Sequence, residues 1–463
     1  MSFELPENLM VSVSGVRGRV GEVLTPEVVT RFAAAFGAWV RERAGRSAVV
    51  VARDSRTSGS MFARSVTAAL QSVGHDVLEL GLVPTPTALL AIRHHGAAGG
   101  IVVTASHNPV EWNALKFASA EGMFLDAGQS QAMQAFLQDR PIPRSGWNGI
   151  GGVRADDRAV QRHIDRVLAI PFLDVEGIRR RRFRVALDCV RGAGAVLLPA
   201  LLEALGCDTV TLHAEPDGRF PRPPEPVAAN LGELEALVRE RGADVGLATD
   251  PDADRLSLVD ERGCAIGEDF TLALAVALVL RHRPGPVVTN LSTSRLLDDI
   301  AAAAGVVLER APVGEINVAR AMQAAGATVG GEGNGGVILP DVQLTRDSAV
   351  ATALTLQTLL EVAEPLHRIV AEYGPYAIVK AALPRPEGSI DAALGLLARE
   401  LDAPRTDRRD GLRLDWPEAK KWLHLRPSGT EPVFRIIAEA PDEGVARGLV
   451  DRARRALGGA APT

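Results

Sequence analysis

The sequence predicts an α/β protein with three similar mixed α/β domains, built from βαβ units, and a C-terminal α+β domain. Three segments repeat one pattern of apolar strand, turn, helix, glycine and second apolar strand: 47–80, 183–212 and 285–313. This alternation is typical of βαβ units with largely parallel sheets. After residue 367 the strands and helices follow in α+β order. A chain of 463 residues also exceeds one ordinary hydrophobic core.

These patterns divide the chain into four parts. The three repeats share almost no residue identity, so they indicate a common architecture and not a close duplication. Cuts near Asn148, Ser257 and His367 predict domains at 1–148, 149–257, 258–367 and 368–463.

Composition limits the class of function. The formal net charge of −6 argues against a general nucleic-acid or membrane-surface role, which needs a basic face. The three cysteines are far apart and lack CxxC spacing, so neither a disulfide framework nor a zinc site is expected. The first residues do not have the pattern of a signal peptide. The apolar run 270–280 is too short to span a bilayer, and we expect it to form a buried helix. We expect a cytoplasmic monomer or homodimer that binds a small molecule.

The first chemical loop is TASHNP, Thr104 to Pro109, directly after the apolar strand GIVVT. A serine at the carboxyl end of a parallel strand, here Ser106, lies where α/β sheets usually present chemistry. Taken alone, a turn whose hydroxyl bonds the backbone explains the motif slightly better. A Ser-His-Asp hydrolase fits poorly, because the GxSxG elbow is missing and His107 is adjacent to the serine.

The second loop is TDPDADR, Thr249 to Arg255. Asp250, Asp252 and Asp254 would repel one another in a tight loop unless a cation lay among them. Oxygen ligands favour Mg²⁺ or Ca²⁺, and Mg²⁺ leaves coordination positions open for phosphate oxygens. An EF-hand is excluded because Arg255 takes the required glycine position. The remaining alternative is a solvated acidic turn.

The third loop is GGEGNGG, Gly330 to Gly336. Its glycines allow a ligand to approach the backbone, and Glu332 and Asn334 offer hydrogen-bonding groups suited to sugar hydroxyls. It has neither the GK[ST] of a P-loop nor GxGxxG spacing. An ordinary glycine turn is the alternative, and for this loop alone it is the more common case.

The fourth loop is RPSGTEP, Arg426 to Pro432, between two predicted strands. The Arg426 guanidinium, the hydroxyls of Ser428 and Thr430 and the peptide N–H groups around Gly429 are suited to an anion. A polar hairpin turn is an equally good explanation of this loop alone.

In this order, the four loops are much more specific than any one of them. The chain resembles the α-D-phosphohexomutases, which include phosphomannomutase/phosphoglucomutase and phosphoglucosamine mutase. The resemblance runs nearly end to end and includes SGVRG at 14–18, TASHNP with Asn113 and Lys116 downstream, DPDADR, GEGNGG and RPSGTEP. It implies four domains around a central cleft, each contributing one loop.

The resemblance also implies roles for matching residues. Ser106 looks like the phosphoserine, which with the three aspartates would hold Mg²⁺. The other implied site residues are catalytic Arg17, Lys116, Arg255 and His107, sugar-binding Glu332, Asn334, Gly336 and Glu315, and phosphate-binding Arg426, Ser428, Gly429 and Thr430. The implied reaction interconverts hexose 6-phosphate and hexose 1-phosphate through a bisphosphate intermediate, with hexose 1,6-bisphosphate as activator. Phosphoryl transfer consists mostly of positioning and charge stabilisation, which these residue types supply.

Two departures bear on the sugar. Many relatives have a serine and a terminal histidine in the third loop, where this chain has Gly335 and Gly336, and Glu315 stands where a histidine is frequent. The combination of GEGNGG with VGEINV, which contains Glu315, looks more like the phosphoglucosamine mutase branch. A phosphomannomutase/phosphoglucomutase is the alternative, followed by a magnesium-dependent sugar phosphatase and a non-catalytic sugar-phosphate-binding protein.

Overall fold

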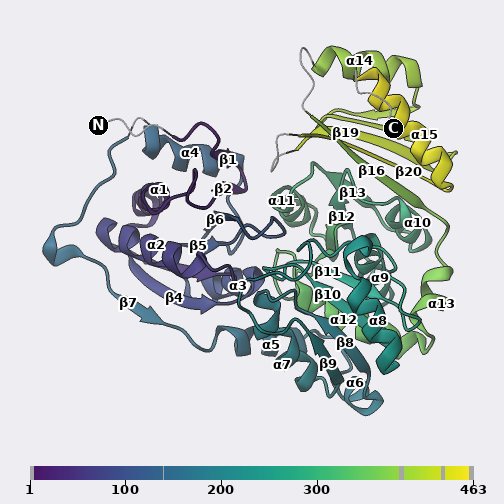
Figure 1. Ribbon diagram of the computed structural model, residues 1–463, viewed down its shortest axis with the longest axis horizontal. Coiled ribbons are helices and arrows are strands. Elements are labelled where there is room, and N and C mark those ends of the chain that lie inside the picture. Colours follow the sequence, from purple (N-terminus) through teal and green to yellow (C-terminus); the bar gives the residue numbers. More distant parts are fainter. Residues whose placement is uncertain (1–4, 139, 385–389, 429–432, 458–463) are drawn as a thin grey trace.

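The computed structural model describes residues 5–138, 140–384, 390–428 and 433–457, which form four β-sheets. Figure 1 shows the first sheet and its helices on one side of the molecule, the second and third sheets packed together, and the last sheet beyond the third. Among the described residues, no helix is long and apolar enough to cross a membrane.

The first sheet has the order β1-β2-β6-β5-β3-β4-β7. Strand β3 is parallel to β4 and β5, whereas β6 is antiparallel to β5. Helix α2 turns its apolar residues to the core at spacings of three and four, which is why this segment folds as an amphipathic helix. The elements are β1 (Met10–Ser12), β2 (Gly15–Arg19), α1 (Pro26–Ala44), β3 (Ala48–Arg53), α2 (Gly59–Val73), β4 (Asp76–Leu82), α3 (Thr85–His95), β5 (Gly99–Val103), β6 (Trp112–Ser119), α4 (Ala127–Gln138) and β7 (Val153–Ala155).

The second sheet has the order β11-β10-β8-β9, with β8 parallel to β9 and β10 and with β11 antiparallel to β10. Its elements are α5 (Ala159–Leu168), α6 (Val175–Arg181), β8 (Arg184–Asp188), α7 (Leu198–Ala204), β9 (Asp208–Leu212), α8 (Gly232–Arg241), β10 (Val245–Thr249) and β11 (Leu256–Val259).

The third sheet has the order β13-β12-β14-β15, with β12 parallel to β13 and β14 and with β15 antiparallel to β14. Its elements are α9 (Glu268–His282), β12 (Val287–Asn290), α10 (Leu296–Ala303), β13 (Leu308–Ala311), α11 (Glu315–Ala325), β14 (Val329–Glu332), β15 (Gly336–Ile338), α12 (Ser348–Val362) and α13 (Leu366–Ala371).

The three sheets share one topological unit. The orders β6-β5-β3-β4, β11-β10-β8-β9 and β15-β14-β12-β13 are equivalent. In each unit the turn between a parallel strand and the next, antiparallel strand carries a chemical loop: TASHNP after β5, DPDADR after β10 and GEGNGG around the end of β14. The prediction of three similar mixed α/β domains is therefore confirmed.

The fourth sheet is antiparallel throughout, in the order β16-β20-β19-β18-β17. Helices α14 and α15 pack together on one face of it, as Figure 1 shows at the C-terminal end of the chain. This confirms the predicted α+β domain. Its elements are β16 (Ala377–Pro384), α14 (Ile390–Leu401), β17 (Arg405–Asp407), β18 (Leu412–Trp416), β19 (Lys421–Pro427), β20 (Val433–Ala440) and α15 (Glu443–Ala456).

The hydrophobic cores are not divided one to a sheet. A single cluster of buried side chains joins the second and third sheets, for example Leu187 and Leu247 with Leu278 of α9 and Leu354 of α12. The apolar run 270–280 lies within α9, so the expectation of a buried helix there is confirmed. The fourth sheet has a separate core around residues such as Phe434.

Polar groups connect the fourth domain to the third. The Glu439 carboxylate accepts hydrogen bonds from the Trp422 indole (2.9 Å) and from the Ser294 hydroxyl (3.1 Å). The Ser292 hydroxyl is 2.8 Å from Nδ1 of His424. The fourth domain therefore has its own apolar core and is joined to the third domain by hydrogen bonds.

Candidate active site

Ser106 lies in the turn that leaves β5, with a positive φ of 49°. That conformation is unfavourable for a residue with a side chain and is maintained only where the surroundings enforce it. The Ser106 N–H donates to Thr104 Oγ1 (3.0 Å), and the Thr104 hydroxyl donates to Asp54 Oδ2 (2.7 Å). These bonds turn the Ser106 hydroxyl towards the second domain.

Arg56 holds the outer side of the same turn. It is 1% exposed, and its Nε donates to Asp54 Oδ2 at 3.1 Å. Its terminal nitrogens donate to four backbone carbonyls, those of Ser106, Asn108, Pro109 and Trp112, at 2.7 to 2.9 Å. Sequence reasoning missed this residue. The available signal was the charged segment RDSR, which follows β3 as TASHNP follows β5.

The second loop, Thr249 to Arg255, is the predicted metal loop and contributes three fully buried carboxylates. One oxygen each of Asp250, Asp252 and Asp254 lies within 4.8 Å of the others. The Ser106 hydroxyl donates to Asp250 Oδ2 at 3.0 Å, so the structure brings the predicted phosphoserine to the predicted metal loop. A positive φ of 54° at Ala253 folds the loop back on itself.

The donors around these aspartates leave defined oxygens unused. Asp252 Oδ2 accepts from Lys116 Nζ (2.9 Å) and from the Thr85 hydroxyl (2.8 Å), and Asp254 Oδ2 accepts from Arg346. Oδ1 of Asp252 and Oδ1 of Asp254 are buried without a hydrogen-bond partner. Buried carboxylate oxygens without donors fit an oxygen-binding divalent cation such as Mg²⁺.

Electrostatics support that fit. Burial, followed by the negative charges of Asp254 and Asp252, raises the pKa of Asp250 well above its ordinary value. Burial also opposes ionisation of Asp252, but the Lys116 ammonium outweighs it and lowers the pKa of that carboxyl. Crowded carboxylates of this kind are relieved by a cation.

Positively charged groups lie beside Ser106. Arg17 donates to Asn108 Oδ1, within the phosphoserine loop. The Arg255 backbone N–H is 3.3 Å from Asp250 Oδ1, and its side chain is 3.3 Å from Glu225 Oε1. These guanidinium groups can stabilise the charge on a transferring phosphoryl group.

His107 is 3.4 Å through Nδ1 from the Ser106 hydroxyl. Burial, and then the positive charges of Arg255 and Arg17, hold its pKa well below the usual range. The imidazole is therefore neutral at pH 7 and can exchange a hydrogen bond with a group on Ser106.

The sugar loop presents Glu332 at the end of β14. Its Oε1 accepts from Asn290 Nδ2 (2.7 Å) and from the Gly314 N–H (3.1 Å), and its Oε2 accepts from Arg346 Nη1 (2.6 Å). Burial opposes ionisation of Glu332, but the Arg346 charge outweighs it and the pKa is lowered. Glu332 is thus an oriented carboxylate.

The other predicted sugar residues surround Glu332. Oδ1 of Asn334 is buried without a partner, as expected of an acceptor available to a ligand. Glu315 begins α11 and contacts Arg346 Nη2 (3.3 Å) and the Arg346 N–H (3.1 Å). Burial raises the pKa of Glu315. A Cβ at Gly336 would lie 2.2 Å from Cδ of Arg346, so this glycine leaves room for the arginine.

Arg346 is the second residue that sequence reasoning missed. Its guanidinium contacts Asp254 of the metal loop and Glu332 and Glu315 of the sugar region. The surrounding residues LTRDS match no motif, so its role depends on contacts that only the folded chain provides.

The phosphate loop is described only in part, since Gly429 and Thr430 lie outside the described residues. Arg426 Nε donates to Asp410 Oδ2 (2.8 Å), which also accepts from the Val313 N–H (3.0 Å). Val313 is two residues from Glu315, so Asp410 connects the fourth loop to the sugar region. The Ser428 N–H donates to the Val433 carbonyl at 2.8 Å.

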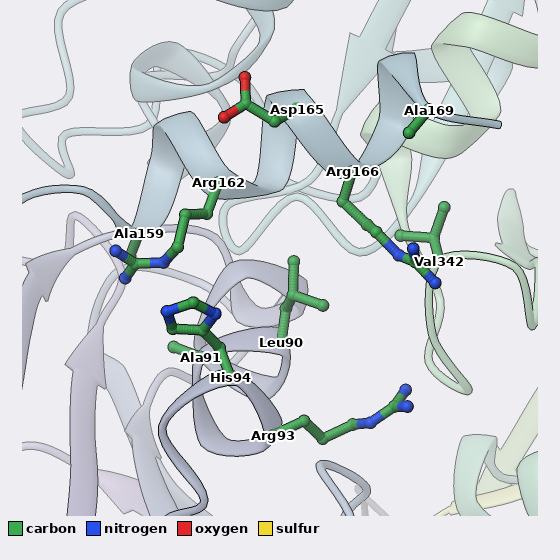
Figure 2. A pocket seen from close by; sticks show the side chains of 10 residues that line it. All are labelled: Leu90, Ala91, Arg93, His94, Ala159, Arg162, Asp165, Arg166, Ala169 and Val342. Atoms are coloured by element: carbon green, nitrogen blue, oxygen red, sulfur yellow. The ribbon is translucent and has the colours of Figure 1, made fainter.

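A hollow of about 500 Å³ lies elsewhere, between α3 and α5. Figure 2 shows it lined by apolar side chains such as Leu90 and Val342 and by Arg93, Arg162 and Arg166. It contains no residue of the four loops, and we assign it no part in the chemistry.

Comparisons with known proteins cover the whole arrangement. The sequence matches the alpha/beta/alpha domains I, II and III and the C-terminal domain described as phosphoglucomutase/phosphomannomutase, at residues 9–140, 161–263, 267–376 and 378–456.

Individual proteins agree with these matches. The chain is 39% identical to a phosphoglucomutase/phosphomannomutase of Thermococcus kodakarensis, over 94% of this chain and 95% of that one. It is 36% identical to a probable phosphoglucosamine mutase of Methanopyrus kandleri, over 95% of each. A phosphoglucomutase/phosphomannomutase family protein from Burkholderia thailandensis has a similar structure, with a TM-score of 0.84 and 27% identity over 98% of this chain and 99% of that one.

Proposed function

Because the chain belongs to the phosphoglucomutase/phosphomannomutase family of α-D-phosphohexomutases, we propose that it interconverts a hexose 6-phosphate and a hexose 1-phosphate through a phosphorylated Ser106. The observation that carries the proposal is the 3.0 Å hydrogen bond from the Ser106 hydroxyl to Asp250. It joins the group that would carry phosphate to the group of oxygens that fits a cation.

Two half-reactions account for the residues. In the first, the bond from phosphorus to Ser106 Oγ breaks and a bond to the free sugar hydroxyl forms, giving a hexose bisphosphate. The proton lost by that hydroxyl is gained by Ser106 Oγ, and Lys116 is the proposed carrier. In the second, the bond from the other phosphorus to its sugar oxygen breaks and a bond to Ser106 Oγ forms. The proton lost by the Ser106 hydroxyl is gained by that sugar oxygen, which leaves the isomeric hexose monophosphate.

Mg²⁺ bound by Asp250, Asp252, Asp254 and a phosphoserine oxygen would supply positive charge to the transferring group. Arg17, which bonds Asn108, and Arg255, which contacts Asp250, would add their positive charge near Ser106, and neutral His107 can hydrogen-bond to a group on Ser106. The 2.9 Å contact from Lys116 to Asp252 keeps the proposed proton carrier within the same group of residues. A hexose 1,6-bisphosphate would activate the enzyme by phosphorylating Ser106.

The sugar and its second phosphate require separate groups. Oriented Glu332 and the buried, unpartnered Asn334 oxygen support binding of sugar hydroxyls. The fourth loop, with Arg426 and Ser428, is the proposed anchor for the phosphate that is not being transferred.

Among hexoses we propose glucosamine phosphate. The supporting observation is Glu315, an acid beside the sugar loop whose side chain is 9% exposed, at a position where a histidine is frequent in phosphomannomutase/phosphoglucomutase enzymes. A phosphomannomutase/phosphoglucomutase is the second candidate, favoured by the name of the relative that is 39% identical.

The deciding experiment assays the purified chain on glucosamine, mannose and glucose 6-phosphates with Mg²⁺ and a hexose 1,6-bisphosphate. Fastest turnover of the glucosamine ester is expected, and equal or faster turnover of mannose or glucose esters would overturn the preference. Release of free phosphate without isomer would instead identify a phosphatase.

Ser106→Ala is expected to lower the isomerisation rate by at least about a thousandfold, since the group that carries the phosphate is gone. Mass spectrometry of the wild-type chain should find one phosphate on Ser106. Ser65→Ala, on α2, serves as the control. Unchanged activity of Ser106→Ala would remove the mechanism and leave a different or non-catalytic role.

A further inference from the structure

We propose that Arg346 is a positioning residue that holds a metal-loop carboxylate and a sugar-loop carboxylate in fixed relation through one guanidinium group. The inference rests on the proposed function, because it concerns how those two loops act together. It goes beyond that function by assigning a role to a residue that belongs to neither loop.

The geometry at Arg346 carries the first part of the argument. Nη2 donates to Asp254 Oδ2, and Nη1 donates to Glu332 Oε2 at 2.6 Å. Because a guanidinium is planar and rigid, the two carboxylates it joins cannot move independently. The side chain is only 8% exposed, so water cannot easily replace these bonds.

Asp254 shows what the contact achieves. With Oδ2 bonded to Arg346, its Oδ1 is buried without a hydrogen-bond donor, and Arg255 Nε lies 3.7 Å from it. The two oxygens of Asp252 differ in the same way. Lys116 and Thr85 donate to Oδ2, whereas Oδ1 has no hydrogen-bond partner. Arg346 therefore does for Asp254 what Lys116 and Thr85 do for Asp252: it determines which oxygen remains available to a cation.

The surroundings of Arg346 are adapted to it. The Glu315 carboxylate accepts from the Arg346 backbone N–H (3.1 Å) and contacts the guanidinium (3.3 Å), which fixes both ends of the residue. Asp347 caps α12 by accepting from the Ala349 N–H (2.9 Å), so Arg346 is anchored directly before a helix. Any side chain at Gly336 would collide with Cδ of Arg346.

The test uses Mn²⁺, a paramagnetic substitute for Mg²⁺, so that binding can be measured by electron paramagnetic resonance without turnover. Arg346→Lys keeps the positive charge but loses the fork that spans two loops. Its Mn²⁺ dissociation constant is expected to rise about tenfold or more, the usual effect of removing a group that orients a metal ligand. The KM for the hexose phosphate should rise by more than kcat falls.

Two further variants complete the design. Arg413→Lys makes the same change at another buried arginine, whose guanidinium bonds Asp415 and the Leu291 carbonyl outside the site, and it should leave Mn²⁺ affinity unchanged. Gly336→Ala keeps Arg346 but displaces it and should weaken Mn²⁺ binding in the same direction. This variant also tests the proposal if Arg346→Lys fails to fold.

The outcomes separate the inference from the proposed function. Wild-type Mn²⁺ affinity and KM in both Arg346→Lys and Gly336→Ala would overturn the positioning role, even in a fully active mutase. Tighter Mn²⁺ binding in Arg346→Met would show that the arginine acts only as a competing charge, and would overturn it as well. Weaker Mn²⁺ binding in Arg346→Lys, in a chain that forms no isomer, would support the positioning role while rejecting the proposed function.

Discussion

Arg56 and Asp54 form a fully buried ion pair beneath the turn that contains Ser106. The pair connects the end of β3 to the turn after β5 that contains Ser106, because the same guanidinium donates to four backbone carbonyls of that turn. A buried pair adds little net stability when intact, but breaking it leaves an uncompensated charge.

We therefore expect Arg56→Met to reduce the free energy of unfolding by about 3–5 kcal/mol and to abolish most activity, because the positive φ at Ser106 loses its support. Thermal denaturation followed by circular dichroism measures the first effect, and the mutase assay the second. Arg64→Met, at an exposed position of α2, is the control. A variant with wild-type melting would show that the turn is held by other contacts.

Asp269 gives a pH-dependent prediction. Burial raises the pKa of its carboxyl from 3.8 to about 7, against the opposing charge of Lys380. Between about pH 4 and 7 the folded chain keeps a proton that the unfolded chain has released, so this contribution to stability falls as the pH rises through that window. It is fully present only below the unfolded pKa.

Asp269→Asn removes the titration but keeps an acceptor for the Ser294 N–H. The melting temperature of the variant relative to wild type is expected to rise from pH 4 to pH 7 and then to stay constant. Fluorimetric melting across this range measures it, with Asp391→Asn on the exposed face of α14 as control. A difference independent of pH would contradict the assignment.

At the scale of residues, the sequence predicted one site only through the resemblance of the four loops to a known family. Ser106 follows β5 of the first sheet and the three aspartates follow β10 of the second, so the strand order within one sheet could not bring them together. Arg346 could not be found in this way, since it acts through contacts with distant segments and matches no motif. Arg56 had a signal in the charged segment RDSR at the end of β3, but its contacts with the Ser106 turn are seen only in the folded chain. Which oxygen of Asp254 is unpartnered is likewise fixed only by folding. The roles of the predicted site residues stay predictions until the assays are done.

At the scale of elements, the turn between β14 and β15 is bound to the strand that follows the metal loop. The Leu256 N–H donates to the Gly335 carbonyl at 2.9 Å, and Gly335 has a φ of +87°. A Cβ there would lie 2.3 Å from the Leu256 carbonyl oxygen. The sugar loop and β11 therefore need glycine at this position for two reasons, conformation and space.

Gly335→Ala is expected to lower the melting temperature and to raise the KM for the hexose phosphate, because the loop must shift to relieve the collision. Gly305→Ala is the matched control: Gly305 also has a positive φ of 66°, but a Cβ there meets nothing within 4 Å. It should lose only about 1–2 kcal/mol of stability and keep its KM. Equal effects on KM in the two variants would argue against a role for this contact in the sugar loop.

Periodicity was informative for the elements themselves. The three strand–helix–strand repeats, the buried helix α9 and the α+β order of the final domain were predicted from apolar spacing, whereas the antiparallel order of the final sheet was not predicted. The predicted cuts at residues 148 and 257 were harder to place: β7 pairs with β4 of the first sheet after residue 148, and β11 extends past residue 257. Strands as short as β7 and β11 have too few residues to show a clear alternation of apolar and polar side chains, so the sequence does not mark where these strands begin and end. The predicted domain boundaries therefore stay predictions.

At the scale of the whole molecule, the distribution of apolar contacts predicts how the chain unfolds. The second and third domains share one core through α9 and α12, whereas the fourth has its own core and is hydrogen-bonded to Ser292 and Ser294 of the third. The sequence could not reveal this, because each helix is equally apolar whether it packs within a domain or between two.

Differential scanning calorimetry should therefore resolve the fourth domain as a separate transition, while the second and third domains melt together. Limited proteolysis between α13 and β16 should release the fourth domain before any cut separates the other two. Glu439→Gln, which weakens acceptance from Trp422 and Ser294, should speed that release. A single cooperative transition for the entire chain would contradict this division.

The equivalent turns of the first three domains also have a consequence for the way such a protein can diversify. Each turn is built on its own sheet, so one turn can acquire new side chains while the other two keep theirs. On the proposed function, substrate preference can therefore change through the turn between β14 and β15 while the turn that contains Ser106 is kept. A residue that contacts two turns, as Arg346 does, is more constrained, because a substitution there affects both turns at once.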